Sequence, residues 1–212
     1  MQPLEIDMKT YRRLEHYTYF SQMRQPYLGV TVNIDITDFR HTIKRAAIPF
    51  FLTVLHRIAR AANSVPELRQ RVTHGRIVEY PWCDTSHTVA LADGTYCYCR
   101  LCADMPLRDF LPYAQKNQEE AKRLRSLDDG DESDSLLFIS SLPRLSYTAL
   151  IQPTPEPTDY NPRITIGGFF ETEGKTRLPV SILANHALVD GQHITQFYDH
   201  LAALIRNTPS EL

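Results

Sequence analysis

The chain has 212 residues, of which 42% are hydrophobic, and its formal net charge at pH 7 is -2. This size and hydrophobic content suffice for one buried core, so we predict a single domain over residues 1–212. The nearly balanced charge argues against a nucleic-acid partner, and no apolar run is long enough to cross a membrane. The first residues lack the charged and apolar regions of a signal peptide, which predicts a cytoplasmic protein.

Apolar periodicity divides the first part of the chain into alternating and helical stretches. In chain order it predicts a strand over 29–36, helices over 39–47 and 49–62, strands over 75–80, 86–91 and 95–102, and a helix over 106–125. Asp38 is a candidate N-cap of the first helix, and Pro49 suits the first turn of the second. Asp93-Gly94 is a hairpin turn signal between two of the strands.

The second part of the chain begins with an acidic run over 128–135, which is typical of a solvated loop. Four strands are predicted after it, over 136–142, 146–151, 163–170 and 178–186, with a proline-rich loop over 152–162. A terminal helix carries the apolar stripe Ile194, Phe197, Leu201 and Leu204. Helices and strands follow no strict alternation, so we predict an α+β two-layer sandwich, a mixed β-sheet with helices packed on one side.

Three of the four cysteines lie close together as Cys97, Cys99 and Cys102, with His87 nearby in the sequence. This spacing lacks the second paired cluster of a zinc site. Cys97 and Cys99 would share one face of a strand, where a thiol packs as a small apolar group. We therefore predict reduced thiols and no metal site.

The segment Asn185-His186-Ala187-Leu188-Val189-Asp190-Gly191 is the most informative in the chain. Val180, Ile182 and Ala184 alternate into His186, which would continue their inward-facing row. Histidine is well suited to move a proton near neutral pH, and Asp-Gly predicts a turn before the terminal helix. By itself the pattern leaves two alternatives, because a lone histidine at the end of a buried strand is commonly structural.

The chain resembles the chloramphenicol acetyltransferase family, whose signature is His-His-Ala-x-x-Asp-Gly before a terminal helix. Further resemblances occur in the family's order from about residue 4 to residue 205. They are Tyr11-Arg12-Arg13-Leu14-Glu15-His16-Tyr17, Asn33-Ile34-Asp35-Ile36-Thr37, Val65-Pro66-Glu67-Leu68-Arg69, Phe138-Ile139-Ser140-Ser141-Leu142-Pro143 and Pro162-Arg163-Ile164-Thr165. A single motif of this kind is moderately specific, whereas the ordered set is specific for the fold.

The resemblance implies transfer of acetyl from acetyl-CoA to a hydroxyl of chloramphenicol or a similar small alcohol, and hence antibiotic resistance. It implies that His186 is the general base and that Ser140 donates to the oxyanion, with water held by Thr165. It also implies an ion pair between Asp190 and Arg13 that supports the loop. Each of these roles has a purely structural alternative. Asp190 could only cap a helix, Arg13 could be exposed to solvent, and Ser140 and Thr165 could be ordinary strand residues.

The resemblance further implies a homotrimer with sites at subunit interfaces, acetyl-CoA as a co-substrate and no permanently bound cofactor. Phe20, Tyr27 and Leu28 are implied to contact the substrates, and the segment 20–28 would be hidden in the trimer. The sequence departs from the family pattern at Asn185, which replaces the first histidine, and at Phe20, which replaces a tyrosine. Gly167-Gly168-Phe169 replaces a lysine and a tyrosine, so the CoA contacts are expected to differ.

Two rival functions are weighed against this one. The acyltransferase core of a 2-oxo acid dehydrogenase complex has His-Arg-x-x-x-Asp-Gly, but here Ala187 follows His186 and the chain has no room for lipoyl domains. An inactive relative that acts as a binding protein is the second rival, suggested by Phe20 and Asn185.

Overall fold

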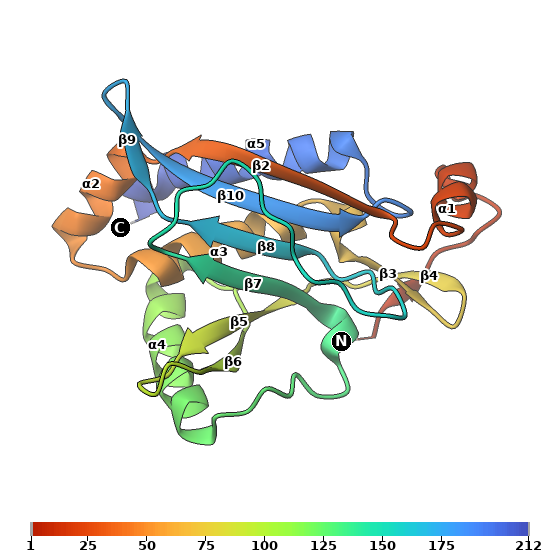
Figure 1. Ribbon diagram of the computed structural model, residues 1–212, viewed down its shortest axis with the longest axis horizontal. Helices are drawn as coiled ribbons and strands as arrows, with labels where there is room; N and C mark the ends of the chain where they lie inside the picture. Colours follow the sequence, from red (N-terminus) through yellow and green to blue (C-terminus); the bar gives the residue numbers. More distant parts are fainter. Residues whose placement is uncertain (1, 212) are drawn as a thin grey trace.

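The computed structural model describes residues 2–211 and places helices on one face of a mixed β-sheet (Figure 1). The sheet has the strand order β2-β10-β8-β7-β5-β6, with β9 beside β10. Its strands are β2 (Tyr27–Asp35), β5 (Asp84–Ala90), β6 (Tyr96–Leu101), β7 (Leu136–Leu142), β8 (Arg163–Gly167), β9 (Phe170–Thr172) and β10 (Lys175–Asn185). The β5-β7 and β7-β8 pairs are parallel and the others are antiparallel, which confirms the predicted mixed sheet.

Three short strands form a separate antiparallel sheet in the order β1-β4-β3. They are β1 (Leu4–Glu5), β3 (Gln70–Thr73) and β4 (Arg76–Glu79). The α-helices are α1 (Leu14–Phe20), α2 (Thr37–Ala46), α3 (Phe50–Asn63), α4 (Leu107–Leu124) and α5 (Gly191–Asn207). Short 3-10 helices span Pro66–Arg69, Ser133–Ser135 and Thr208–Glu211. None of the helices within residues 2–211 is long and apolar enough to span a membrane.

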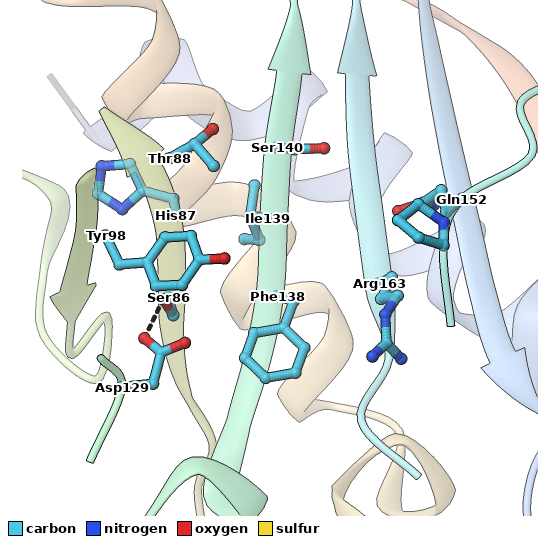
Figure 2. A pocket seen from close by; sticks show the side chains of 11 residues that line it. Ser86, His87, Thr88, Tyr98, Asp129, Phe138, Ile139, Ser140, Gln152 and Arg163 are labelled. Atoms are coloured by element: carbon cyan, nitrogen blue, oxygen red, sulfur yellow. Dashed lines mark hydrogen bonds between the residues drawn. The ribbon is translucent and has the colours of Figure 1, made fainter. Parts of the chain in front are cut away.

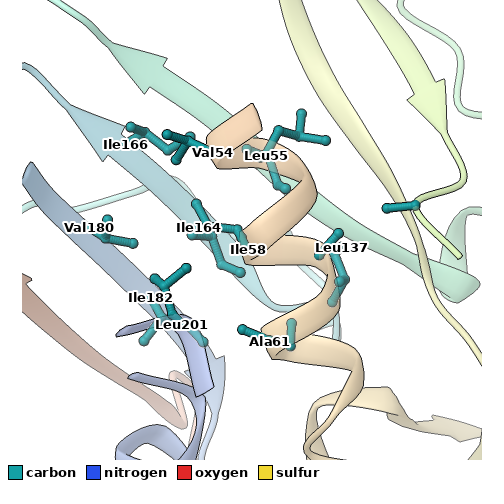
Figure 3. Packing of buried hydrophobic residues seen from close by; sticks show 14 of the residues in the cluster. Val54, Leu55, Ile58, Ala61, Leu137, Ile164, Ile166, Val180, Ile182 and Leu201 are labelled. Carbon is teal, nitrogen blue, oxygen red and sulfur yellow. The ribbon is translucent and has the colours of Figure 1, made fainter. Parts of the chain in front are cut away.

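The hydrophobic core lies between α3 and the sheet (Figure 3). The helix buries apolar residues that recur at helical spacing, because one side of it faces the strands. The strands contribute every second residue to the same core, as expected for a sheet covered on one face. The buried contacts in Figure 3 include Val54, Leu55, Ile58, Ala61, Leu137, Ile164, Ile166, Val180 and Ile182.

The opposite face of the sheet is crossed by the long segment 143–162 (Figure 1). The strand predicted over 146–151 is wrong, because this segment is a loop. Strand β7, which precedes the segment, already has β5 on one side and β8 on the other, so the segment cannot pair beside it. Tyr147 fastens the loop, since its hydroxyl donates to the carbonyl of Thr165 at 3.0 Å.

Gly168 allows the start of this loop to pack closely on the sheet. A Cβ at position 168 would lie 2.7 Å from the carbonyl oxygen of Pro143, a distance that side chains do not adopt. The amide of Gly168 donates to the carbonyl of Leu145 at 2.7 Å. The glycine that departs from the family pattern therefore has a local steric reason.

Three predicted details differ from the structure. Asp38 lies inside the first turn of α2 and is not its N-cap, because the Asp35 carboxylate already accepts from the amide of Thr37 at 3.2 Å. The strand predicted over 163–170 is divided into β8 and β9. Strand β10 ends at Asn185, so His186 does not continue the buried row of Val180, Ile182 and Ala184 but begins a turn.

Candidate active site

His186 lies in the turn that connects β10 to α5 and is half-buried. Its amide donates to the carbonyl of Pro26 at 2.6 Å, which ties the turn to the segment before β2. Its carbonyl accepts from Arg13 Nη2 at 3.4 Å. The backbone of this residue is therefore held from two sides by parts of the chain far away in sequence.

The imidazole of His186 is oriented by a backbone group and by an aromatic ring. Nδ1 lies 2.8 Å from the carbonyl oxygen of Val189. A carbonyl only accepts hydrogen bonds, so Nδ1 carries the proton and the neutral ring has its lone pair on Nε2. Phe20 stacks on the imidazole with 3.9 Å between ring centroids and 22° between planes. The ring is thus fixed with Nε2 as a base.

Asp190 combines the two roles between which the sequence leaves a choice. As the N-cap of α5 its carboxylate accepts from the amide of Gln192 at 2.9 Å, and it forms a capping box with His193. The same carboxylate forms an ion pair with Arg13, whose side chain is 13% exposed. Burial acts to raise the pKa of Asp190, but the charges of His193 and Arg13 and the backbone donors outweigh it, so its pKa lies below the ordinary value.

Ser140 belongs to a row of hydroxyl groups that crosses the face of the sheet opposite the helices. Its Oγ lies 2.7 Å from Oγ1 of Thr165. The register places Thr165 beside Ser181, whose Oγ lies 2.7 Å from Oγ1 of Thr31. Hydroxyls that already have partners are well defined in position, and the half-buried Ser140 can rotate its proton toward a developing negative charge.

A cavity of about 290 Å³ lies beside Ser140 on this face (Figure 2). Strands β5, β6, β7 and β8 contribute to its wall, together with two surface segments. Its lining residues are Ser86, His87, Thr88, Tyr98, Asp129, Phe138, Ile139, Ser140, Gln152, Pro153 and Arg163. The space is sufficient for a small molecule that reaches the Ser140 hydroxyl.

His87 also lines this cavity, but the contacts of its ring are those of a structural residue. It packs on Phe51 of α3 with 5.4 Å between ring centroids. Its Nε2 lies 2.9 Å from the side-chain amide of Gln118, which donates to it. Burial lowers the pKa of His87 to about 4, so the ring is neutral at pH 7 with one nitrogen already engaged. His186 is therefore the better candidate base.

His186 and Ser140 are far apart within one chain. The register puts Ser140 beside Thr165 and Thr165 beside Ser181. His186 comes five residues after Ser181, which places it about 16 Å along the strands and about 10 Å across them from Ser140. One chain by itself does not bring these two residues together.

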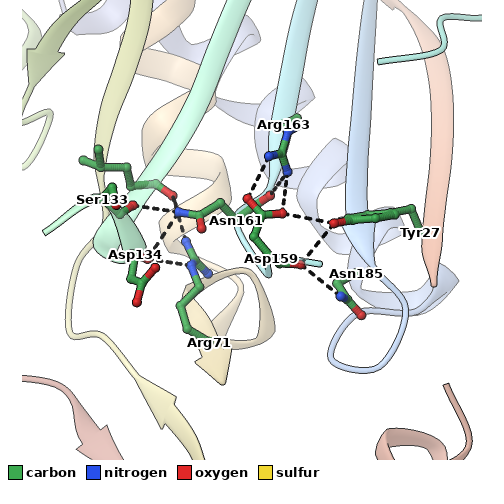
Figure 4. A network of polar contacts seen from close by, with 9 residues as sticks. Tyr27, Arg71, Ser133, Asp134, Asp159, Asn161, Arg163 and Asn185 are labelled. Atoms are coloured by element: carbon green, nitrogen blue, oxygen red, sulfur yellow. Dashed lines mark hydrogen bonds and ion pairs between the residues drawn. The ribbon is translucent and has the colours of Figure 1, made fainter. Parts of the chain in front are cut away.

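A polar network surrounds the residue before His186 (Figure 4). Asn185 donates from Nδ2 to the carbonyl of Asp159 at 3.0 Å and accepts at Oδ1 from the amide of Ala187 at 3.0 Å. Asp159 also binds Arg163 through both carboxylate oxygens, at 2.8 and 2.7 Å. Asn185 therefore connects the turn that carries His186 to the segment that precedes β8.

Tyr27 joins the same network, since its hydroxyl donates to Asp159 Oδ1 at 3.1 Å. Burial and the neighbouring Asp159 carboxylate raise its pKa to about 12, so it is a neutral donor. Leu28 packs against the hydrophobic core and is not brought close to the cavity. Of the three residues expected at the substrates, only Phe20 touches His186.

Sequence reasoning missed two contributors to this site. Val189 acts through its backbone carbonyl, which every residue type carries, so no sequence signal marks it. Asp129 lines the cavity from within the acidic run that is predicted to be a solvated loop. Within residues 2–211 no three His, Cys, Asp or Glu side chains are grouped as a metal site, and the four cysteines are free.

Comparison with known proteins gives one consistent result. The family model described as chloramphenicol acetyltransferase matches residues 1–202. A chloramphenicol acetyltransferase 2 of Haemophilus influenzae is 26% identical over 207 residues, which cover 95% of this chain and 96% of the relative. A chloramphenicol acetyltransferase of Escherichia coli is 26% identical over 200 residues, covering 92% and 90%.

Solved structures agree on the fold. A chloramphenicol acetyltransferase structure superposes with a TM-score of 0.83 at 23% identity and covers 96% of this chain and all of its own length. A probable dihydrolipoamide acetyltransferase from Listeria monocytogenes has a TM-score of 0.66 at 12% identity, covering 98% and 95%. The first rival, the acyltransferase core of a 2-oxo acid dehydrogenase complex, is thus similar in fold, but with a lower TM-score and lower identity than the chloramphenicol acetyltransferase structure. With the family model matching nearly the whole sequence, the chain belongs to the chloramphenicol acetyltransferase family, which is a family of acyltransferases.

Proposed function

We propose that this protein transfers acetyl from acetyl-CoA to a hydroxyl of chloramphenicol or a similar small alcohol, with His186 as general base. The observation that carries the proposal is the hydrogen bond from Nδ1 of His186 to the Val189 carbonyl. In the neutral ring this bond places the proton on Nδ1 and leaves the lone pair on Nε2. A base in that state can accept the proton of an alcohol at neutral pH.

In the reaction the alcohol oxygen attacks the thioester carbon while its proton passes to Nε2 of His186. The carbonyl oxygen becomes an oxyanion, which the hydroxyl of Ser140 stabilises by donating a hydrogen bond. Thr165 supports this role because its Oγ1 lies 2.7 Å from the Ser140 Oγ and can accept or donate as required. The intermediate then releases the CoA thiolate, which takes the proton back from the imidazolium, leaving an acetyl ester and free CoA.

The active protein is a homotrimer in this proposal, with each site formed between two chains. The separation of His186 from Ser140 within one chain supports it, because both groups must flank the same carbonyl carbon. A neighbouring copy that presents its His186 to the Ser140 cavity satisfies this requirement. Such a heterologous contact closes into a ring in a cyclic oligomer. A cytoplasmic location is also proposed, supported by four free thiols.

The first test measures thiol release from acetyl-CoA with chloramphenicol or another small alcohol as acceptor. Release that depends on the alcohol is expected for the native protein, with kcat reduced about a hundred- to ten-thousand-fold in His186→Ala. Release only with other alcohols keeps the reaction and changes the acceptor. Absence of alcohol-dependent release with every acceptor supports an inactive relative and refutes the proposal.

The second test combines two inactive variants in one oligomer. His186→Ala and Ser140→Ala are co-expressed, and the mixed oligomers are assayed beside each variant alone. If each site takes its histidine from one chain and its serine from another, random mixing restores about a quarter of the sites. Absence of recovery in oligomers shown to contain both chains would contradict the shared site.

A further inference from the structure

The cavity beside Ser140 contains one carboxylate, that of Asp129, at the end away from Ser140 (Figure 2). Asp129 is half-buried, and its Oδ1 accepts from the hydroxyl of Ser86 at 2.5 Å. Ser86 is 3% exposed, so this end of the cavity is a built polar site and not a surface position. A charged group placed there interacts with whatever molecule enters the cavity.

Among the residues that the structure describes, no basic side chain forms an ion pair with this carboxylate. Of the two basic side chains on the described cavity wall, His87 is neutral at pH 7, and the guanidinium of Arg163 is already bound by both oxygens of Asp159. Arg100 forms its ion pairs with Asp84 and Glu132. Burial and the charge of Asp128 raise the pKa of Asp129 and outweigh the opposing effects of the Ser86 hydrogen bond and the charge of Arg100. The carboxylate therefore favours a positive group in the cavity.

The register of the strands gives the spacing between Ser86, which holds Asp129, and Ser140. Ser86, which holds Asp129, lies beside Phe138 on the neighbouring strand, and Ser140 comes two residues after Phe138. Two residues of strand rise and one strand spacing separate the Cα atoms of Ser86 and Ser140 by about 8 Å. An acceptor of about this length, whose hydroxyl reacts beside Ser140, can thus place a second group at the Ser86 and Asp129 end of the cavity.

We infer that the preferred acceptor of this enzyme is an amino alcohol, whose ammonium group binds Asp129 while its hydroxyl is placed beside Ser140. The inference rests on the proposed acetyl transfer and names the substrate class of that site. The ammonium donates to the carboxylate and supplies the missing counter-charge. The remaining wall fits the stem of such a molecule, because Phe138 and Pro153 are apolar while Thr88, Tyr98 and Gln152 can bind further hydroxyls.

The test compares linear acceptors that differ only at the end remote from the reacting hydroxyl. Aminohexanol, with its two groups at opposite ends, is measured against hexanediol and against the shorter aminopropanol. A charge-assisted hydrogen bond predicts that kcat/KM for aminohexanol exceeds that for hexanediol by about ten- to a hundred-fold. Aminopropanol should lose most of this advantage because it cannot span the distance. O-acetylation of the product is verified by mass spectrometry.

Variants of the loop show whether Asp129 is the cause. Asp129→Asn should remove the preference for aminohexanol over hexanediol, and Asp129→Lys should favour hydroxyhexanoate instead. Asp128→Asn is the matched control, because Asp128 is an exposed carboxylate of the same loop that does not line the cavity. It should leave the preference unchanged. Circular dichroism of each variant checks that the fold is retained.

The outcomes separate this inference from the proposed reaction. His186-dependent acetylation of hexanediol without any preference for aminohexanol, or a preference that survives Asp129→Asn, overturns the inference and leaves acetyl transfer intact. No acetylation of any alcohol overturns the reaction. In that case calorimetry of aminohexanol binding to His186→Ala tests the inference by itself. Binding that is lost in the His186→Ala, Asp129→Asn double variant supports the inference. Binding that does not depend on Asp129 overturns it.

Discussion

The Asp190–Arg13 ion pair gives a prediction whose size can be worked out from the structure. Asp190→Asn keeps an oxygen for the amide of Gln192, and asparagine caps helices about as well as aspartate, so the cap is nearly unchanged. The change therefore removes mainly the ion pair. The two side chains are 13% and 30% exposed, between surface pairs worth about 0–1 kcal/mol and buried pairs whose rupture costs about 3–5 kcal/mol. We expect a loss of about 2 kcal/mol in the free energy of unfolding at pH 7.

The same pair sets a pH dependence. The pKa of Asp190 is lower in the folded protein than its ordinary value of 3.8, because the charges of His193 and Arg13 and the backbone donors outweigh burial. A carboxyl with a lowered folded pKa contributes stability above its unfolded pKa and loses it as the pH falls through the folded pKa. The difference between the native protein and Asp190→Asn should therefore be complete at pH 7 and shrink as the pH falls below about 4.

Urea unfolding at one fixed protein concentration measures both effects. A double-mutant cycle with Arg13→Gln isolates the pair, and Asp199→Asn on the exposed side of α5 is the charge-matched control, expected within about 0.5 kcal/mol of the native protein. Acetyl transfer should fall in Asp190→Asn, because Arg13 also holds the carbonyl of His186. Native stability at pH 7, or zero coupling between positions 13 and 190, would refute the reasoning.

Three further variants test other parts of the structure. Ser140→Ala should lower kcat about a hundred- to a thousand-fold with little change in the urea midpoint, and an unchanged kcat would remove Ser140 from the mechanism. Gly168→Ala should cost about 1–3 kcal/mol, because the new Cβ meets the carbonyl of Pro143 at 2.7 Å; a native urea midpoint would contradict this account of the loop. Tyr198→Phe should lower the free energy of unfolding by about 1–2 kcal/mol, since the buried hydroxyl of Tyr198 donates to the Val180 carbonyl at 2.8 Å. A variant whose Tm equals that of the native protein would show that this bond contributes nothing to stability.

Most of the secondary structure and the fold class were predictable from the chain itself. Apolar residues at helical spacing marked α3, α4 and α5, and strict alternation marked β2 and β10, because the geometry of each element decides which side chains share a face. The turn signal after Val189 and the N-cap at Asp190 are equally local. The failed strand over 146–151 shows the limit, because its residues suit a strand but β7, the strand directly before it, already pairs on both sides with β5 and β8.

The arrangement of the candidate site was decided by the tertiary structure. His186 is oriented by the backbone carbonyl of Val189, a group that every residue type has, so the sequence does not mark it. Ser86 contacts Asp129 only because the fold brings together residues that are 43 positions apart. The family resemblance assigns His186 and Ser140 to one reaction, whereas the sheet register holds them apart within one chain, which is why the proposed reaction needs a second chain. Local pattern determines which face each residue occupies, but distances between elements follow from strand order and loop paths, which no short stretch of sequence contains.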